Sequence, residues 1–464
     1  MFRSALGLST PALSRLLADI DSEIAARRNI EPLLHLLDQT RRPLYESLAN
    51  RFDPVAAKAL TVKILNLCLG KYHFLARSTT LLSRPYGLVV DPINNCNLAC
   101  PGCVHSSRAK ELELFQWTSG LLSEERYAAL LDAYGPAAIH ITLCNYGEPL
   151  LNFKTPDFIR LAKRYLMRTT VSTNMTAPRF NAAAWAASGL DFMTLSIDGA
   201  TQGVYEKYRR KGHLDVVFRN IRSLVEARRD LGKRTPVLSW QFLAFEHNAH
   251  EIDMAIGMAR DLGVDQLTVA TPFDVSWDDP AIKPANVEPR TIQFGGDSES
   301  AIAANWNPFP EDLGAAAIER DFEIGWAARL PALPEEINRR RPETTHTCHW
   351  LYKNMVMDAT GRVIPCCAAP RPDADLVFSN FDASGAESFN TEKHRLARLS
   401  FADKEAYRNE RRANPLPAEP HCTNCDWYSD QEAAVVDRGQ VESYFRAIGE
   451  PPFDGASRKV LASW

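Results

Sequence analysis

The segment NCNLACPGCVHS, residues 95–106, holds three cysteines at C-x3-C-x2-C spacing, and it follows a short apolar run at 87–90 that is typical of a β-strand. Three thiolates hold three irons of a four-iron cubane, which normally takes four cysteine ligands. No fourth cysteine stands close by in the sequence, so one iron keeps an open position for a substrate or cofactor. Zinc is the alternative metal. Structural zinc sites favour paired C-x2-C knuckles and four ligands, and His105 follows Cys103 too closely to complete a knuckle.

Composition narrows the class of protein. The chain has 464 residues, of which 45% are hydrophobic and 24% charged, so it is long enough for two or three packed domains. Its net charge of −4 and its lack of a basic run with interleaved aromatics predict no nucleic-acid partner. The ten cysteines gather at the triplet and near the C-terminus, which is typical of metal ligands and not of a disulfide framework. Neither a signal-like N-terminus nor an apolar stretch of membrane-spanning length occurs, so we expect no transmembrane segment and a cytoplasmic location.

The order of apolar patterns predicts an α/β fold. Strand patterns alternate with helical ones from residue 87 onward. The expected strands are Gly87–Asp91, Ala138–Leu143, Thr169–Ser172, Phe192–Ile197, Val237–Phe245 and Gln266–Ala270. Six such units imply a partial (β/α)6 barrel, TIM-like, with functional loops at the carboxyl ends of the strands. The expected organisation is a helical N-terminal region (1–83), the partial barrel (84–275), an irregular proline-rich connector (276–341), a small cysteine-rich domain (342–440) and a C-terminal tail (441–464).

Polar motifs follow the expected strands in order. The second strand leads to Asn145-Tyr146-Gly147-Glu148-Pro149, where glycine permits close approach of the backbone and a carboxylate accepts hydrogen bonds from an ammonium group. The third strand ends in Ser172-Thr173-Asn174, and the fourth in Ser196-Ile197-Asp198-Gly199 with Arg209 beyond it. A cap or turn role explains any one of these residues equally well. It does not explain the ordered series.

The triplet and this series together resemble the radical S-adenosylmethionine (SAM) superfamily. The resemblance implies a [4Fe-4S] cluster on Cys96, Cys100 and Cys103 whose open iron chelates the amino and carboxylate groups of SAM. It also implies that Glu148 accepts a hydrogen bond from the SAM amino group, and that the carboxylate and ribose are held by Ser172, Asn174, Ser196 and Arg209. Met175 departs from the family pattern, which usually has glycine at this position.

A second cysteine set lies near the C-terminus. Cys348 precedes an expected β-hairpin whose turn is Asp358–Gly361, Cys366 follows the hairpin, and Cys422 and Cys425 form a C-x2-C pair. This pattern resembles the SPASM/twitch accessory domains of radical SAM enzymes, and it implies one closed auxiliary [4Fe-4S] cluster. The resemblance is to the shorter, twitch-like form, because no cysteine follows Cys425. Zinc is the alternative for this set also.

Three residues near these motifs have no firm assignment. Cys144 ends the second strand and is a weak candidate for a hydrogen-atom donor, with core packing as its alternative. Cys367, next to Cys366, is a spare thiol and the other weak catalytic candidate. His247 follows the fifth strand, where a histidine is more often structural.

The resemblance implies an enzyme that reductively cleaves SAM to a 5′-deoxyadenosyl radical and oxidises or otherwise modifies a small molecule such as a sugar or nucleoside. The auxiliary cluster would relay the electron, and flavodoxin or ferredoxin would supply the reductant. One alternative is a maturase of a ribosomally made peptide or protein, docked by the helical N-terminal region. The other is a non-catalytic iron-sulfur carrier or zinc scaffold, which leaves Glu148, Ser172 and Ser196 unexplained.

Overall fold

A computed structural model describes most of the chain outside its ends and a long stretch after residue 298. The described residues are 30–50, 54–106, 119–272, 279–296, 298, 348, 350–366, 377–381, 388–414 and 420–424. The chain divides into two compact units. One comprises Met1–Tyr86, Ala316–Met355 and Glu387–Trp464, and the other comprises Gly87–Ala315 and Val356–Ala386.

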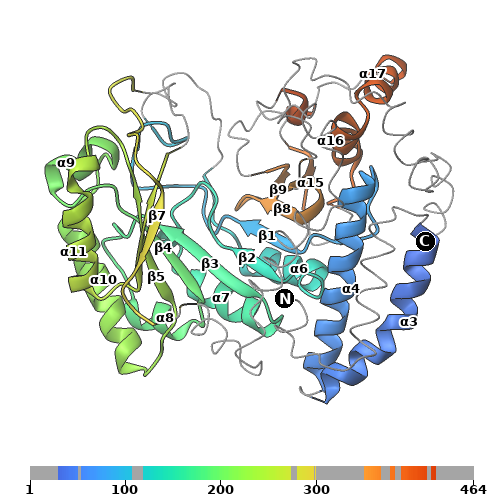
Figure 1. The fold of residues 1–464 in the computed structure, drawn as a ribbon, viewed down its shortest axis with the longest axis horizontal. Coiled ribbons are helices and arrows are strands. Elements are labelled where there is room, and N and C mark those ends of the chain that lie inside the picture. Colours follow the sequence, from blue (N-terminus) through green and yellow to red (C-terminus); the bar gives the residue numbers. More distant parts are fainter. Residues whose placement is uncertain are drawn as a thin grey trace. The chain divides into compact units, whose positions relative to one another are not determined.

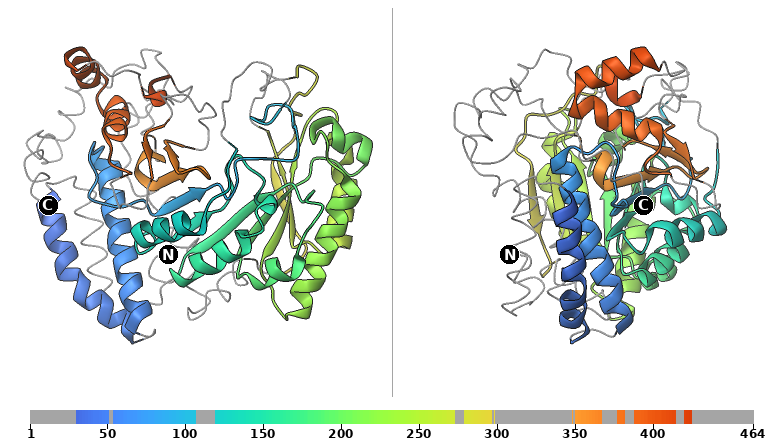
Figure 2. Two further views of the ribbon diagram at one scale, coloured as in Figure 1. Left: turned by 180° about the vertical axis from the view of Figure 1, so that it is seen from behind. Right: turned by 90° about the vertical axis from the view of Figure 1, so that its right-hand side faces the viewer.

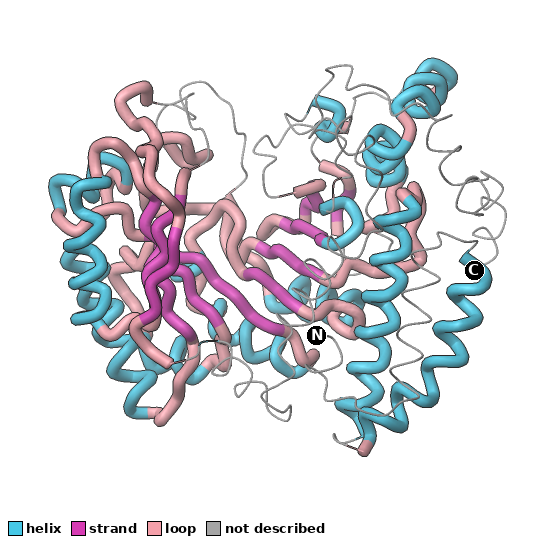
Figure 3. The backbone as a smooth tube through the Cα atoms, in the orientation of Figure 1, coloured by secondary structure: helices cyan, strands magenta, loops and turns pink. Residues whose placement is uncertain are grey.

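The second unit is built on a parallel sheet. Six strands lie side by side in sequence order (Figure 3): β1 (Gly87–Val90), β2 (His140–Thr142), β3 (Arg168–Thr173), β4 (Phe192–Ser196), β5 (Val237–Leu243) and β6 (Gln266–Ala270). Antiparallel strands continue the sheet on both sides: β7 (Arg290–Gln293) next to β6, and β8 (Asn354–Met357), β9 (Arg362–Ile364) and β10 (Ser379–Asn380) beyond β1. The boundary between the units falls within β8. The predicted α/β class and the six parallel strands are confirmed, as an open sheet.

Helices make the parallel crossovers, because parallel neighbours cannot be joined by a tight turn. They are α6 (Glu124–Tyr134), α7 (Thr155–Arg164), α8 (Ala182–Ala187), α9 (Gln202–Tyr208), α10 (Leu214–Asp230) and α11 (Ile252–Leu262), with the 3-10 turns η1 (Pro149–Leu151) and η2 (Ala249–Glu251). In Figure 1, α10 and α11 lie side by side along the outside of the sheet. The side of α10 that is buried carries Val217, Ile221 and Leu224, at the spacing of one helix face.

The two faces of the sheet differ in chemistry. Along β3, Thr169, Val171 and Thr173 are buried while Thr170 and Ser172 are half-buried, and β6 alternates in the same way. The half-buried face carries hydroxyl pairs from neighbouring strands. They are Thr142 with Thr170 at 2.8 Å, Ser172 with Ser196 at 3.2 Å, and Thr268 with Thr291 at 3.0 Å between oxygens. The face opposite the apolar core is therefore lined by hydrogen-bonding groups.

Two features of this unit bear on the sequence predictions. The hairpin of β8 and β9 is confirmed: Asp358 accepts hydrogen bonds from the backbone N–H groups of Thr360 and Arg362, and Gly361 has a φ of +96° that favours glycine. Strand β7 lies within the stretch that we expected to be irregular. Its four residues are mostly exposed, so they lack the apolar alternation from which a strand is predicted.

The regular structure described in the first unit is helical, apart from the start of β8. It contains α3 (Ile30–Ala49) and α4 (Pro54–Ala76), which pack side by side (Figure 2), and α15 (Trp350–Lys353), α16 (Glu392–Ala402), α17 (Lys404–Ala413) and the 3-10 turn η3 (His421–Asn424). The guanidinium of Arg398, in α16, is fully buried and donates to the carbonyl oxygens of Leu351 and Phe389 at 2.9 and 2.8 Å. Arg398 thus ties α16 to the segments that precede it. In the described residues of the chain, none of the helices has both the length and the apolarity to cross a membrane.

Candidate active site

The predicted site residues of the second unit gather at one edge of its sheet. The loop with Cys96, Cys100 and Cys103 follows β1, Glu148 follows β2, and Ser172, Asn174 and Ser196 stand at the ends of β3 and β4. Parallel neighbours in register bring their carboxyl ends to the same edge. Arg209 follows α9 and closes the group, since its guanidinium reaches Cys100.

A buried carboxylate at the end of β1 organises the loop after β2. Oδ1 of Asp91 accepts hydrogen bonds from three consecutive backbone N–H groups, those of Asn145, Tyr146 and Gly147, at 2.7, 3.0 and 3.1 Å. Asp91 is fully buried, and burial raises the pKa of its carboxyl from 3.8 to about 7 although the three donors lower it. The sequence analysis missed this residue. The sequence feature that could have identified Asp91 is an acidic residue directly after an apolar strand.

Gly147 and Glu148 fix the position of the loop after β2. A Cβ on Gly147 would lie 1.6 Å from the carbonyl oxygen of Ile93, so only glycine fits against that backbone. The Glu148 carboxylate is buried and accepts hydrogen bonds from the backbone N–H of Leu150 (3.0 Å), the Thr173 hydroxyl (2.6 Å) and the backbone N–H of Asn174 (2.8 Å). Burial raises the pKa of Glu148, and these three donors oppose that shift. Glu148 therefore ties the loop after β2 to the end of β3.

The end of β3 places an amide next to the cysteine loop. Nδ2 of Asn174 lies 3.6 Å from Sγ of Cys96 and 3.1 Å from Oδ1 of Asn97. Met175, the position where the family usually has glycine, has a φ of +56° and is fully buried. Residues other than glycine rarely adopt a positive φ angle. Met175 therefore replaces the usual glycine of the family at a position whose backbone conformation favours glycine.

A buried ion pair positions the arginine after α9. Nε of Arg209 lies 2.5 Å from Oδ2 of Asp198, whose other carboxylate oxygen accepts the backbone N–H of Leu243 at 2.7 Å. Nη1 of Arg209 lies 3.9 Å from Sγ of Cys100. Asp198 is fully buried, and it was quoted in the strand-end motif without a role.

The three thiols of the triplet pack within an apolar cluster. Cys100 is buried and Cys96 and Cys103 are partly buried, packed with a cluster of Leu98, Tyr208, Leu243, Phe245 and Ile282. Burial raises the pKa of both Cys96 and Cys100 above its ordinary value, because a buried thiolate needs a positive partner. Iron would supply that charge, and the donor set fits three corners of a four-iron cluster. No three His, Cys, Asp or Glu side chains in the described residues gather as ligands of one metal ion. In a cubane each thiolate binds a different iron.

Cys144 and His247 border this site. The thiol of Cys144 is 3.9 Å from the carbonyl oxygen of Gly147, and burial raises its pKa well above the usual value. A thiol that stays protonated is consistent with either core packing or hydrogen-atom donation. The ring of His247 stacks on Phe245, with ring centroids 5.5 Å apart.

The second cysteine set is divided between the units. Cys348 precedes α15 and Cys422 lies buried in η3, both in the first unit, whereas Cys366 follows β9 in the second. Cys367 and Cys425 lie outside the described residues. The assignment of these cysteines to one auxiliary cluster stays a prediction.

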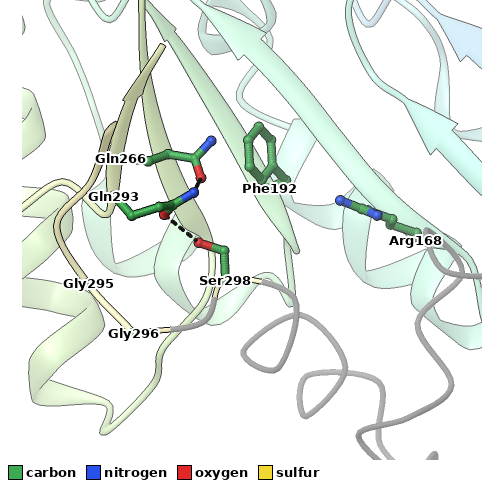
Figure 4. A pocket seen from close by; sticks show the side chains of 7 residues that line it. All are labelled: Arg168, Phe192, Gln266, Gln293, Gly295, Gly296 and Ser298. Carbon is green, nitrogen blue, oxygen red and sulfur yellow. Dashed lines mark hydrogen bonds between the residues drawn. The ribbon is translucent and has the colours of Figure 1, made fainter. Parts of the chain in front are cut away.

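A cavity of about 520 Å³ opens at the opposite end of the strands (Figure 4). Its lining residues are Arg168, Phe192, Gln266, Gln293, Gly295, Gly296 and Ser298. Nε2 of Gln293 donates to Oε1 of Gln266 at 2.8 Å. Arg168 and Ser172 are four residues apart on β3, so roughly 13 Å of strand separates this cavity from the hydroxyls near the triplet.

Three thiols in an apolar cluster, at the carboxyl edge of a parallel sheet and beside a glycine-glutamate turn, form the arrangement that the resemblance to radical SAM enzymes predicts. Residues 90–238, about a third of the chain, match the family model described as the Radical SAM superfamily, so this part of the chain is a radical SAM domain.

Three comparisons show what the chain is similar to. It is 28% identical over 130 residues to GTP 3′,8-cyclase of Limosilactobacillus fermentum, an alignment that covers 28% of this chain and 38% of that protein. Among solved structures, SuiB of Streptococcus suis matches with 16% identity and a TM-score of 0.44, over 78% of this chain and 74% of that one. BtrN, in complex with AdoMet and 2-DOIA, matches with 13% identity and a TM-score of 0.37, over 74% of this chain and 94% of that one.

Proposed function

We propose that the chain reductively cleaves SAM and uses the resulting radical to oxidise or otherwise modify a polar small molecule such as a sugar or nucleoside. The observation that carries this proposal is the convergence of Cys96, Cys100 and Cys103 with Glu148 and Arg209 at one strand edge. When bound, the cluster supplies one electron and the SAM supplies the 5′-deoxyadenosyl radical. The protein binds, orients and shields these groups.

Each strand-end residue has a proposed part in holding SAM. Ser172 and Ser196, with hydroxyl oxygens 3.2 Å apart, present donors and acceptors for the ribose and carboxylate. Glu148 fixes the turn after β2, and its carboxylate is the proposed acceptor for the SAM ammonium. Arg209 and Asn174 complete the set beside the cysteines.

The polar face of the sheet supports a polar substrate. Hydroxyls of Thr142 and Thr170 stand next to Ser172 along this face. Neutral donors and acceptors recognise hydroxyl and amide groups without demanding a charge. A sugar or nucleoside meets this requirement, and a peptide backbone is the alternative.

We further propose an auxiliary [4Fe-4S] cluster on Cys348, Cys366, Cys422 and Cys425 that accepts the electron from the substrate radical. Four cysteines make a complete ligand set, so this cluster has no open iron for SAM. Cys366 is preferred to Cys367 because of its spacing after Gly361.

The experiment that tests the function is anaerobic reconstitution followed by reduction with dithionite in the presence of SAM. We expect two four-iron clusters per chain and formation of 5′-deoxyadenosine, measured by iron analysis and chromatography. Replacing Cys96, Cys100 and Cys103 together by Ala should leave one cluster and abolish 5′-deoxyadenosine. Cys144→Ala is the matched control, which should keep both clusters. Stoichiometric zinc with iron near zero in the anaerobically purified protein would refute the proposal.

The auxiliary cluster has its own test. Cys366→Ala should lose one cluster and still cleave SAM without coupled product, whereas Cys367→Ala should keep both. The reverse result would exchange the two assignments. Comparing metabolites between wild-type and deletion cells would identify the substrate class, and accumulation of an unmodified peptide would favour the maturase alternative.

A further inference from the structure

Two nitrogen donors approach the cysteine triplet from different elements. Nδ2 of Asn174, at the end of β3, lies 3.6 Å from Sγ of Cys96, and Nη1 of Arg209, after α9, lies 3.9 Å from Sγ of Cys100. Asn174 is 5% exposed, and the Arg209 side chain is 14% exposed. Water therefore competes little for either donor.

The orientation of the Asn174 amide is fixed by its other contacts. Both the backbone N–H and the hydroxyl of Thr176 donate to Oδ1 of Asn174, at 2.8 and 2.6 Å. A flipped amide would set its own N–H groups against these donors. The NH2 group must therefore face Asn97 and the thiol of Cys96.

The guanidinium of Arg209 is also fixed in position by its contacts. Asp198 binds its Nε at 2.5 Å, and the guanidinium lies over the ring of Tyr208 at 5.2 Å from the centroid. The carboxylate uses its other oxygen on the backbone N–H of Leu243, so the ion pair cannot swing away without breaking β5 contacts. A permanent positive charge is thereby kept beside Cys100.

We propose that Arg209 and Asn174 act on the cluster itself and raise its reduction potential. Hydrogen bonds to cluster sulfurs and nearby positive charge stabilise the reduced form, which carries one more negative charge. Both residues are thus positioning residues for electron entry, in addition to any contact with SAM. This inference rests on the proposed function, because it requires the cluster on Cys96, Cys100 and Cys103.

The test is a potentiometric titration of the full-length holoprotein in the absence of SAM, with the reduced cluster detected by electron paramagnetic resonance at each potential. The relevant signal is the one that the triple cysteine variant lacks. Arg209→Gln should lower the equilibrium constant for reduction at least tenfold, which is about 59 mV toward negative potential for a one-electron couple. Asn174→Ala should shift it in the same direction by less, and Arg209→Lys should shift it less than Arg209→Gln.

Ser196→Ala is the matched control, since Ser196 has a proposed contact with SAM and neither a charge nor a bond to a cysteine sulfur. Its midpoint should equal that of the wild type. Arg209→Gln leaves Asp198 buried without its partner, so if that variant does not fold, Asn174→Ala decides the question alone. An unchanged midpoint in the recovered variants would overturn the inference, even if their SAM affinity falls. Failure of the wild type to show any iron-sulfur signal would instead refute the proposed function.

Discussion

Removing the Glu148 carboxylate should destabilise the site measurably, because three donors depend on it. Glu148→Ala leaves the backbone N–H groups of Leu150 and Asn174 buried without an acceptor, while the Thr173 hydroxyl can rotate. An unsatisfied buried donor costs roughly 1–3 kcal/mol, so we expect a loss of about 4 kcal/mol. At roughly 2–4 °C per kcal/mol for a unit of this size, the midpoint of thermal unfolding should fall by about 10 °C.

Glu148→Gln separates charge from geometry. Its oxygen can keep the two donors that now share Oε1, but its NH2 group would face the N–H of Asn174, so we expect a loss of about 2 kcal/mol. The matched control is Glu206→Ala, which removes an exposed glutamate and should change stability by less than about 0.5 kcal/mol. The assay is thermal unfolding of the anaerobic holoprotein followed by circular dichroism. Equal midpoints for the Ala, Gln and wild-type proteins would show that the carboxylate does not hold the turn.

Three further substitutions test the same edge of the sheet. Gly147→Ala places a Cβ 1.6 Å from the Ile93 carbonyl oxygen, so we expect loss of SAM binding by isothermal calorimetry; wild-type affinity would mean that the loop relaxes freely. Asp91 has a folded-state pKa of about 7 against an ordinary 3.8, so wild-type stability relative to Asp91→Asn should fall as pH rises through this window, by about 2 kcal/mol between pH 5 and 7. Parallel urea titrations of both proteins would show this, and a pH-independent difference would contradict it. Met175→Gly relieves about 1 kcal/mol of backbone strain at φ +56° but loses a buried side chain worth about 2–5 kcal/mol. In urea titrations the wild type should be the most stable, Met175→Gly the next and Met175→Ala the least stable. A Met175→Ala protein more stable than Met175→Gly would exclude the strain.

The sequence predicted the sheet well because the parallel strands are either short apolar runs or alternating segments, and each is followed by a polar loop. Leu88 to Val90 is an apolar run that is buried throughout, and the first four residues of β5, Val237 to Trp240, are also buried. The same regularity placed the Cys96 and Glu148 loops at one edge, since parallel strands end together. Strand β7 was not predicted because its exposed residues carry no apolar alternation, and its pairing with β6 is set by the tertiary fold.

The supports of the site were harder to predict than its named residues. Asp91 acts on amides 54 to 56 residues away in the sequence, and no local pattern distinguishes it from an aspartate at an ordinary turn. Asp198 was part of a quoted motif, but its partner Arg209 was assigned to SAM alone, and the ion pair follows from burial of both groups. Sequence shows which side chains are chemically suitable. Their mutual hydrogen bonds depend on the fold.

The two buried carboxylates have a consequence for motion. Asp91 fastens the loop after β2 to the end of β1, and Glu148 fastens the same loop to the end of β3. The backbone amides of residues 145, 146, 147, 150 and 174 therefore share two acceptors instead of a regular ladder. Opening any one segment breaks the bonds of the others, so these amides should exchange their hydrogens with solvent as one cooperative unit. If the exchange rates of these amides differ and are not correlated, the three strand ends open independently of one another.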